Sequence, residues 1–171
     1  MSELISLIVC TLGRTAPLER LLTSLKSQTY RNFEVVLVDQ NPSGFLDPIL
    51  EKFSDQPIIR LKSAKGLSRG RNAGLAQCRG TIIGFPDDDC WYDPDVLRLV
   101  DTFFSENPTF GFFSGRTVDG SNHDSVSRYL AASTHVTPAK IFLIGNSNTF
   151  FVRRKPALET NRFDEALGVG S

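Results

Sequence analysis

The chain carries three consecutive carboxylates, Asp87, Asp88 and Asp89, directly after the apolar run Thr81–Phe85. Adjacent carboxylates repel one another, so a divalent cation or a set of arginine and lysine donors usually keeps such a cluster ionised at neutral pH. An isolated acidic turn is most often only solvated. A buried strand in the apolar run would instead deliver these carboxylates to the edge of a sheet, so we predict a cation-binding turn there.

A second acidic position follows another apolar run, because Phe33–Val38 leads into Asp39. In open α/β sheets, ligands bind in the crevice outside the carboxyl ends of the strands. An isolated Asp39 would be interpreted as a turn residue that hydrogen-bonds its own backbone. Together with a second acidic turn on the same edge, it can accept hydrogen bonds from a nucleobase N–H or a ribose hydroxyl.

Basic and hydroxyl side chains follow other predicted strands. Arg71 lies near the start of a predicted helix, where a positive charge opposes the helix macrodipole. An anionic partner, either a phosphate or the aspartate cluster, explains Arg71 better than an exposed helix start does. Thr11 and Arg14 follow the first apolar run and offer a hydroxyl and a guanidinium, although such residues also occur in ordinary turns.

The elements that must position these residues alternate between strand and helix patterns. Apolar β-rich runs predict strands over 4–10, 34–38, 58–62, 81–85, 110–116 and 148–152. Apolar residues at helical spacing predict helices over 17–28, 48–53, 68–77 and 94–106 and a helical turn over 155–159, with Asp47 and Asp93 as N-caps before proline. We expect a mixture of loop and short helix over 117–140. The alternation implies an α/β fold with a mostly parallel central sheet flanked by helices.

Composition narrows the class of protein. Lysine plus arginine balance aspartate plus glutamate at 19 each, so no global field attracts nucleic acid or an anionic membrane. No apolar stretch approaches the roughly 20 residues of a transmembrane segment, which leaves only peripheral membrane contact. The three cysteines lack the spacing of a zinc site or a disulfide framework, so we expect reduced thiols in a cytoplasmic protein.

The length and the motifs that are absent point to one domain outside the common nucleotide folds. A chain of 171 residues suits a single domain, and it stops in a glycine-rich segment, so we expect one domain over 1–171 that is incomplete at its C-terminus. The sequence has no dinucleotide-binding glycine fingerprint and no phosphate loop that ends in Gly-Lys-Ser/Thr.

Several segments resemble the inverting nucleotide-sugar glycosyltransferases of family 2, which have the GT-A fold. The run Ser27–Asp39 is similar to the family's passage QTY.NFEVIVVDD. The opening strand, the arginine–asparagine helix start, the aspartate turn, the acceptor-side strand and the loop after it also match, in the segments Ser6–Arg14, Gly70–Gly74, Phe85–Asp89, Ile144–Arg154 and Arg162–Glu165. Cys10 occupies the usual proline position, and Gln40 and Asn41 replace the usual residues after Asp39.

The resemblance implies a GT-A-type Rossmann-like sandwich and assigns roles to the matching residues. The nucleotide would be bound by Thr11, Arg14, Asp39, Arg71, Asp87 and Asp88. The metal, Mg²⁺ or Mn²⁺, would be held by Asp87 and Asp89, and Asp88 would be able to replace either neighbour.

The implied reaction moves a sugar from a nucleoside-diphosphate donor to an acceptor hydroxyl with inversion, while a carboxylate takes the acceptor's proton. The family's general base lies beyond the glycine-rich loop, so we expect the base beyond Ser171 and do not assign it to Asp164 or Glu165. The acceptor would be a carbohydrate or a lipid-linked sugar used in the synthesis of cell-surface polysaccharide. The alternative is a binding-only fragment or pseudoenzyme that holds a nucleotide sugar without efficient transfer.

Two other classes of protein fit less well. A nucleotidyltransferase that makes activated sugars would need a glycine-rich basic loop after the first strand, and Thr11–Arg14 is too short for one. A response regulator or phosphatase would need an Asp-x-Asp-x-Thr nucleophile turn at the same place, and the sequence has none.

Overall fold

The computed structural model describes residues 2–125, 129, 132–137, 146–154 and 162–168, and its centre is one six-stranded sheet. The strand order is β3-β2-β1-β4-β6-β5. The strands are β1 (Ile5–Thr11), β2 (Phe33–Asp39), β3 (Ile58–Lys62), β4 (Ile82–Gly84), β5 (Phe112–Ser114) and β6 (Phe150–Arg153). The pairs β1–β2, β1–β4 and β2–β3 are parallel, whereas β6 runs antiparallel to β4 and β5. This mixed, mostly parallel sheet confirms the predicted fold class.

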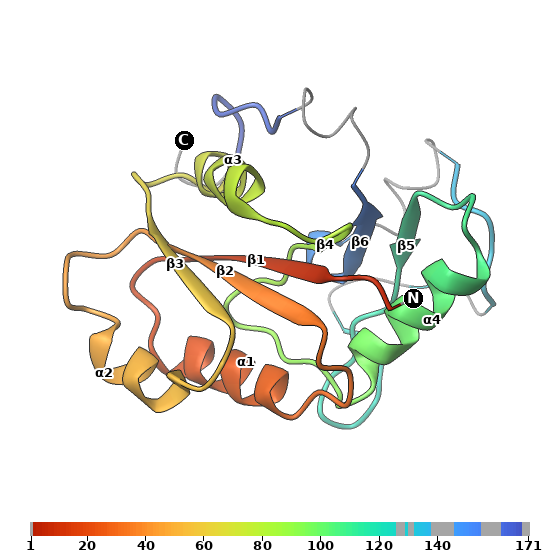
Figure 1. The fold of residues 1–171 in the computed structure, drawn as a ribbon, viewed down its shortest axis with the longest axis horizontal. Helices are drawn as coiled ribbons and strands as arrows, with labels where there is room; N and C mark the ends of the chain where they lie inside the picture. The colour runs from red at the N-terminus through yellow and green to blue at the C-terminus, as the bar shows by residue number, and fades with distance from the viewer. Residues whose placement is uncertain (1, 126–128, 130–131, 138–145, 155–161, 169–171) are drawn as a thin grey trace.

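Helices cover both faces of the sheet (Figure 1). One face carries α1 (Ala16–Lys26), α2 (Asp47–Leu50) and α4 (Val96–Glu106), and the other carries α3 (Leu67–Gln77). Short 3₁₀ turns occupy Glu51–Phe53 and Ser147–Thr149. None of the helices in the described ranges is both long and apolar enough to cross a membrane.

The two central strands are apolar on both faces because helices cover both faces. Along β1, Ile5, Leu7 and Val9 pack in the core that includes the leucine stripe of α1, and Ile8 packs in a second core toward α3. The four predicted α1 leucines, Leu18, Leu21, Leu22 and Leu25, are all buried. The helical spacing of the sequence therefore identified the face of α1 that anchors the sheet.

Glycines permit both the start of helix α3 and its close approach to the sheet. Gly66, the N-cap residue that precedes the helix, has a φ of 127°, a conformation that glycine adopts without steric cost. At Gly74 a Cβ atom would stand 2.4 Å from the Ile8 Cγ2 atom, so only glycine allows α3 to lie this near β1. This close packing fixes the position of Arg71 on the same helix.

Some predicted boundaries were wrong. Helix α2 begins at Asp47 itself, and α4 begins at Val96 with Asp95 rather than Asp93 at its N-cap. The Asp93 carbonyl accepts a hydrogen bond from the Gln28 side chain at 2.8 Å, and the Pro94 carbonyl accepts one from the Thr29 backbone N–H at 2.8 Å. These contacts hold the segment against the end of α1, so the helix starts later.

Toward the C-terminus, β5 and β6 are shorter than predicted or shifted, and β6 follows a 3₁₀ turn. The described part of the stretch 117–140 contains an isolated bridge between Val118 and Asp124. The helical turn predicted over 155–159 lies outside the described residues. Cys10, Cys78 and Cys90 are free thiols, in agreement with the prediction.

Candidate functional site

The acidic corners predicted from the sequence lie at one edge of the sheet. In the β1–β2 register Thr11 pairs with Asp39, and β4 lies parallel to β1 on its other side. The carboxyl ends of β2 and β4 therefore flank the end of β1, and the turns that follow them open at the same edge. This topology is the arrangement that the ligand-site prediction required.

Asp39 is a fully buried carboxylate that is surrounded by donors. Its Oδ2 atom accepts hydrogen bonds from Arg60 Nη2 at 2.7 Å, from Arg60 Nε at 3.0 Å and from Lys62 Nζ at 2.8 Å. Its Oδ1 atom accepts from the backbone and the side chain of Asn41, each at 2.9 Å. Burial alone would raise the pKa of Asp39, but the hydrogen bonds from Lys62, Asn41 and Arg60 lower it to about 2. The group is ionised at neutral pH.

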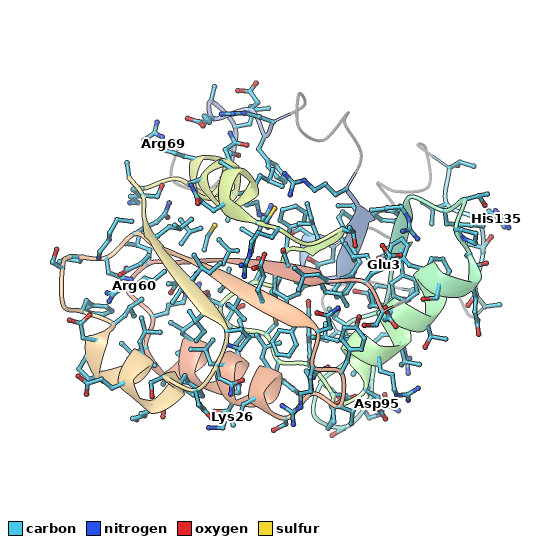
Figure 2. All side chains as sticks on the ribbon, viewed as in Figure 1. Glu3, Lys26, Arg60, Arg69, Asp95 and His135 are labelled. Carbon is cyan, nitrogen blue, oxygen red and sulfur yellow. The ribbon has the colours of Figure 1, made fainter. Side chains whose placement is uncertain are left out.

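Asp39 has no exposed surface, so it contacts a ligand only if one of its donors turns away. The side chains of Lys62 and Arg60 are 47% and 29% exposed, which leaves both cations free to rotate toward a ligand. Neither residue was predicted as part of the site. The signal was present, because Arg60 and Lys62 alternate on the strand next to that of Asp39. Arg60 also binds Asp47 at 2.6 Å and lies on the α2 side of β3 (Figure 2).

Asn41 joins the turns after β1 and β2. Its Oδ1 atom accepts a hydrogen bond from the Gly13 backbone N–H at 2.5 Å, while its amide group donates to Asp39. Gly13 has a φ of 71°, and the turn that it forms leads directly to Arg14. Asn41 therefore couples the buried Asp39 to the loop that presents Arg14. Nothing in the sequence pattern distinguished Asn41 as a site residue.

Arg14 reaches the aspartate turn from the end of β1. Its Nη1 atom donates to Asp88 Oδ1 at 3.0 Å and to Asp89 Oδ2. The neighbouring carboxylates raise the pKa of Arg14 above its usual value. A second arginine, Arg20 of α1, donates to the Asp89 carbonyl oxygen at 2.6 Å and was not predicted. Arg14 therefore holds the turn through its side chains, and Arg20 holds it through its backbone.

The three aspartates differ in environment. Asp88 is buried, whereas the side chains of Asp87 and Asp89 are 40% and 51% exposed. Burial raises the pKa of Asp88, against the opposing effects of Thr11 and Arg14. Burial also raises the pKa of Asp87, against the opposing charge of Arg71, and the charges of its two neighbours raise it further. The turn therefore stores repulsion that a bound cation would relieve.

Thr11 lies beneath the aspartate turn. Its Oγ1 atom is buried and makes no hydrogen bond of normal geometry with the described residues, although it is close enough to Asp88 to lower the pKa of that carboxyl. An unsatisfied buried hydroxyl costs roughly 1–3 kcal/mol. Such a group at a ligand-binding edge fits a site that is completed by a ligand.

Arg71 is nearly buried and points toward the aspartate turn. Its guanidinium lies 5.7 Å from the Phe85 ring centroid and 5.4 Å from that of Phe163. Its Nη2 atom donates to Ser147 Oγ at 3.0 Å and lies 3.6 Å from Asp87 Oδ1. The aromatic rings and the serine fix the orientation of the guanidinium, so the charge stays next to Asp87.

The segment 162–168 packs against α3. Asn72, which is buried, donates to the Phe163 carbonyl and to Glu165 Oε1, each at 2.9 Å, and its Oδ1 atom accepts from the Phe163 backbone N–H at 2.9 Å. Arg69 pairs with Glu165 at 3.4 Å. The Asn72 and Arg69 contacts lower the pKa of Glu165. Glu165 therefore fastens this segment to α3, and with it the Phe163 ring beside Arg71.

The thiols near the site are not nucleophiles. Burial raises the pKa of Cys10 and of Cys90 to about 12, so both stay protonated at neutral pH. Cys10 packs under Gly70, where an added Cβ atom would stand 2.8 Å from the sulfur. The unusual residue at position 10 is thus accommodated by a glycine of α3.

The aspartate turn fits a hard divalent cation. Within the described residues no group of three or more histidine, cysteine or acidic side chains is arranged to enclose a metal by itself. Mg²⁺ and Mn²⁺ do not need such a cage, because one or two carboxylates and the oxygens of a substrate phosphate suffice. Asp89 and Asp87 are the accessible carboxylates, and Arg14 would have to release Asp89 for a cation to bind there.

Comparisons with known proteins agree with this fold. The structure of S. aureus TarS 1–349 in complex with UDP-GlcNAc superposes with a TM-score of 0.74 at 23% identity, covering 87% of this chain and 45% of that one. The mannosyltransferase PcManGT from Pyrobaculum calidifontis, in complex with GDP-Man and Mn²⁺, superposes with a TM-score of 0.59 at 24% identity, covering 67% and 35%. These similarities place the chain among the α/β folds that the sheet topology defines.

The sequence itself matches one family. The family model described as Glycosyl transferase family 2 matches residues 6–164, so the chain belongs to glycosyl transferase family 2. A relative, UDP-Glc:alpha-D-GlcNAc-diphosphoundecaprenol beta-1,3-glucosyltransferase WfaP of Escherichia coli, is 28% identical over 113 residues, which cover 64% of this chain and 45% of the relative. The chain spans less than half the length of each of these three proteins.

Proposed function

We propose that this chain forms, as a single domain over 1–171, the donor-binding part of a glycosyltransferase. The enzyme moves a sugar from a nucleoside-diphosphate donor to an acceptor hydroxyl with inversion and depends on Mg²⁺ or Mn²⁺. One observation carries the proposal: the buried Asp39 and the Asp87–Asp89 turn flank the end of β1 at the ligand-binding edge of the sheet. Family membership supports it.

Each proposed site residue has a role that its environment supports. Asp39 organises Lys62 and Arg60, and the nucleoside takes hydrogen bonds at this corner when the partly exposed Lys62 turns outward. Thr11 supplies a buried hydroxyl between the two corners. Arg71, held in place by Phe85, Phe163 and Ser147, offers a fixed positive charge to the diphosphate.

The aspartate turn and Arg14 handle the charge of the leaving diphosphate. Asp89 and Asp87 would hold the divalent cation, with Asp88 behind them, and the cation would neutralise charge on the departing diphosphate. Arg14, released from Asp89, is positioned to turn toward the phosphates. When the cation and the donor bind, the cation therefore replaces Arg14 at Asp89, and Arg14 pairs with the phosphates.

The acceptor and the cellular setting follow from chemistry and similarity. We propose a carbohydrate or lipid-linked sugar acceptor and a role in cell-surface polysaccharide synthesis, since the name of the E. coli relative specifies a diphosphoundecaprenol-linked GlcNAc as its acceptor. The three free thiols fit a reducing cytoplasm.

A titration of nucleotides tests the proposal. UDP and GDP are titrated calorimetrically with and without Mn²⁺, and we expect at least one to bind more tightly with the metal. Asp89→Asn should abolish the gain from Mn²⁺, and Asp39→Asn should weaken binding in both conditions by about tenfold or more, the scale of a hydrogen bond to a charged group. Asp95→Asn is the matched control, because Asp95 is also 51% exposed and lies on the outer surface at the start of α4 (Figure 2).

Two outcomes would contradict the proposal. One is that neither UDP nor GDP binds the wild-type protein. The other is that Asp89→Asn keeps the full Mn²⁺ effect.

A further inference from the structure

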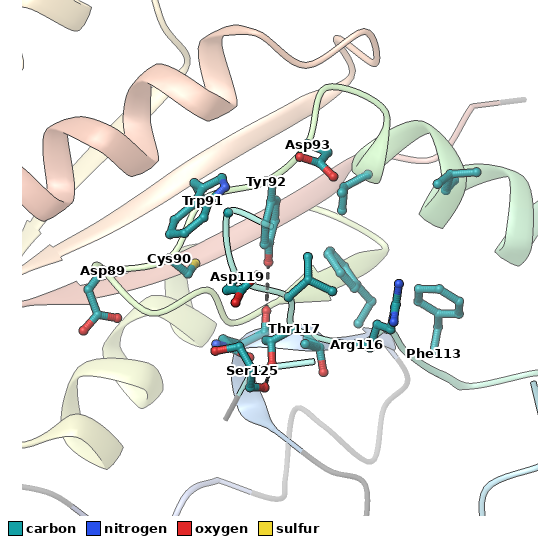
Figure 3. A pocket seen from close by; sticks show the side chains of 18 residues that line it. Asp89, Cys90, Trp91, Tyr92, Asp93, Phe113, Arg116, Thr117, Asp119 and Ser125 are labelled. Atoms are coloured by element: carbon teal, nitrogen blue, oxygen red, sulfur yellow. Dashed lines mark hydrogen bonds between the residues drawn. The ribbon is translucent and has the colours of Figure 1, made fainter. Parts of the chain in front are cut away.

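A pocket of about 450 Å³ opens beside the aspartate turn (Figure 3). Its described lining comes from the loop between β4 and α4, the start of α4, the chain after β5 and the start of β6. In Figure 3 the rings of Trp91 and Tyr92 lie on one side, and Thr117 and Ser125 lie across from them. The volume is in the usual range for small-molecule sites, which is roughly 300–1,000 Å³.

The pocket begins where the proposed donor site ends. Of the residues proposed for the nucleotide and the cation, Asp89 lines the pocket, whereas Thr11, Arg14, Asp39, Arg71, Asp87 and Asp88 do not. The two sites therefore meet at Asp89 and share no other residue of the proposed donor site.

The charges around the pocket select against an anion. Asp89, Asp93 and Asp119 contribute carboxylates to the lining, and Arg116 contributes a single guanidinium. Arg116 is itself paired with Asp124 at 2.9 Å. Because Asp89 is paired with Arg14, the negative charge of the lining comes from Asp93 and Asp119. These two carboxylates would repel a diphosphate or another anionic group, whereas neutral hydroxyl groups would find acceptors in them.

The aromatic wall offers a flat apolar face next to these polar groups. Trp91 is 43% exposed, and the Arg20 guanidinium lies 4.6 Å from its ring centroid, which restrains the ring. Tyr92 is fixed by a hydrogen bond from its hydroxyl to the Asn148 carbonyl at 3.1 Å and by contact with Phe151. A ligand with one apolar face and a rim of hydroxyl groups matches this wall and its polar surroundings better than an alkyl chain does.

We infer that this pocket binds a neutral pyranose ring of the acceptor and presents its hydroxyl group at the Asp89 side of the aspartate turn. The inference rests on the proposed function. Displacement with inversion requires the acceptor oxygen to approach the anomeric carbon from the side opposite the leaving diphosphate. Because the pocket meets the donor residues only at Asp89, an acceptor bound in it would lie beside the donor without overlapping it, as such an approach requires.

Binding of simple sugars tests the inference without knowledge of the natural acceptor. The probes are methyl β-D-glucopyranoside, methyl α-D-mannopyranoside and methyl N-acetyl-β-D-glucosaminide at millimolar concentration, followed by saturation-transfer NMR. Trp91 is the single tryptophan of the chain, so its fluorescence reports binding in the pocket directly. We expect at least one methyl glycoside to bind and to change the Trp91 emission, and glucose 1-phosphate to bind at least about tenfold more weakly because of the carboxylates.

Two variants locate the binding. Trp91→Ala should weaken glycoside binding by about tenfold, the scale of one lost aromatic face, while UDP and GDP affinities stay unchanged. Phe45→Ala is the matched control, because Phe45 is 40% exposed and lies outside the pocket.

The outcomes separate this inference from the donor proposal. If the wild-type protein binds a nucleotide but none of the glycosides, or if Trp91→Ala binds glycosides as tightly as Phe45→Ala does, the pocket inference fails alone. If 1-octanol changes the Trp91 emission and no glycoside does, the pocket is assigned to an alkyl chain and the inference is also overturned. If glycosides bind but no nucleotide does, the donor proposal fails, and the acceptor role of the pocket falls with it.

Discussion

Strand β2 buries a carboxylate near each of its ends, and the two carboxylates have different surroundings. Near the start of the strand, Glu34 accepts hydrogen bonds from Ser6 Oγ at 2.6 Å, from the Arg79 backbone N–H at 2.7 Å and from Arg79 Nε at 2.8 Å. At the other end, Asp39 accepts hydrogen bonds from the side-chain nitrogens of Arg60 and Lys62. The two groups are equally buried, at 1% and 0% exposed.

The difference lies in what the partners can do. Ser6 lies on β1, and Arg79 lies in the connection between α3 and β4, which packs so tightly on β1 that an added Cβ atom at Gly80 would stand 2.6 Å from Ser6. The partners of Asp39 are long cationic side chains that reach solvent. Glu34 also pairs with an exposed cation, because the Arg79 side chain is 69% exposed. The two ends therefore differ in their place in the sheet: Glu34 lies where β2 begins, under the tight packing of Gly80 on Ser6, whereas Asp39 lies at the ligand-binding edge with two cations that reach solvent.

The largest expected effect is a loss of stability when the carboxylate at the Glu34 end of β2 is removed. Glu34→Ala leaves the Ser6 hydroxyl and the Arg79 N–H without their acceptor in a closed site, so we expect a loss of about 3 kcal/mol in the free energy of unfolding. Urea denaturation measures this loss. Glu19→Ala is the control, because Glu19 forms an exposed pair with Lys52 and should cost less than about 0.5 kcal/mol. Equal losses in the two variants would mean that the Glu34 network is not structural.

The second effect is a loss of stability at acidic pH, caused by protonation of Asp39. The pKa of Asp39 is about 2 in the folded protein, below its ordinary value of 3.8, so its ion pairs stabilise the fold above pH 4. That contribution, about 2 kcal/mol, is lost as the pH falls from about 4 to 2. We therefore expect the wild-type protein to lose more stability over this interval than Asp39→Asn does, as measured by urea denaturation at each pH. Parallel pH profiles would show that Asp39 is not held ionised by its cations.

The smallest expected effect is a gain in stability when Asp87 is replaced. Burial and the neighbouring carboxylates raise the pKa of Asp87, so its ionised form costs stability at neutral pH. The Asp87 side chain is 40% exposed, so solvent screens much of this repulsion. Asp87→Asn should therefore raise the free energy of unfolding of the metal-free protein by less than about 0.5 kcal/mol while it weakens the effect of Mn²⁺ on nucleotide binding. Thermal unfolding with and without Mn²⁺ measures both changes. A destabilised variant would indicate that the Arg71 pair outweighs the repulsion within the turn.

Part of the site was predictable because short-range pattern and topology fix it. Asp39 and Asp87–Asp89 each follow an apolar run, and parallel strands bring such turns to one edge. The position of Arg71 near the start of a helix indicated an anionic neighbour, and the structure places Asp87 at 3.6 Å. The N-cap prediction at Asp93 failed because Gln28 and Thr29, which are distant in sequence, hold the chain before α4. At α2 the N-cap is Leu46, and Asp47 is already the first helical residue.

The sequence by itself determined the α/β alternation, the buried leucine stripe of α1 and the edge at which the acidic turns meet, since these depend on the local period of apolar residues. Only the tertiary structure decided that Arg60 and Lys62 hold Asp39, that Arg14 and Arg20 hold the aspartate turn, and that a pocket opens beside Asp89. These contacts join residues that are 21 to 75 positions apart. They depend on strand register and side-chain packing, which the local order of residues does not contain.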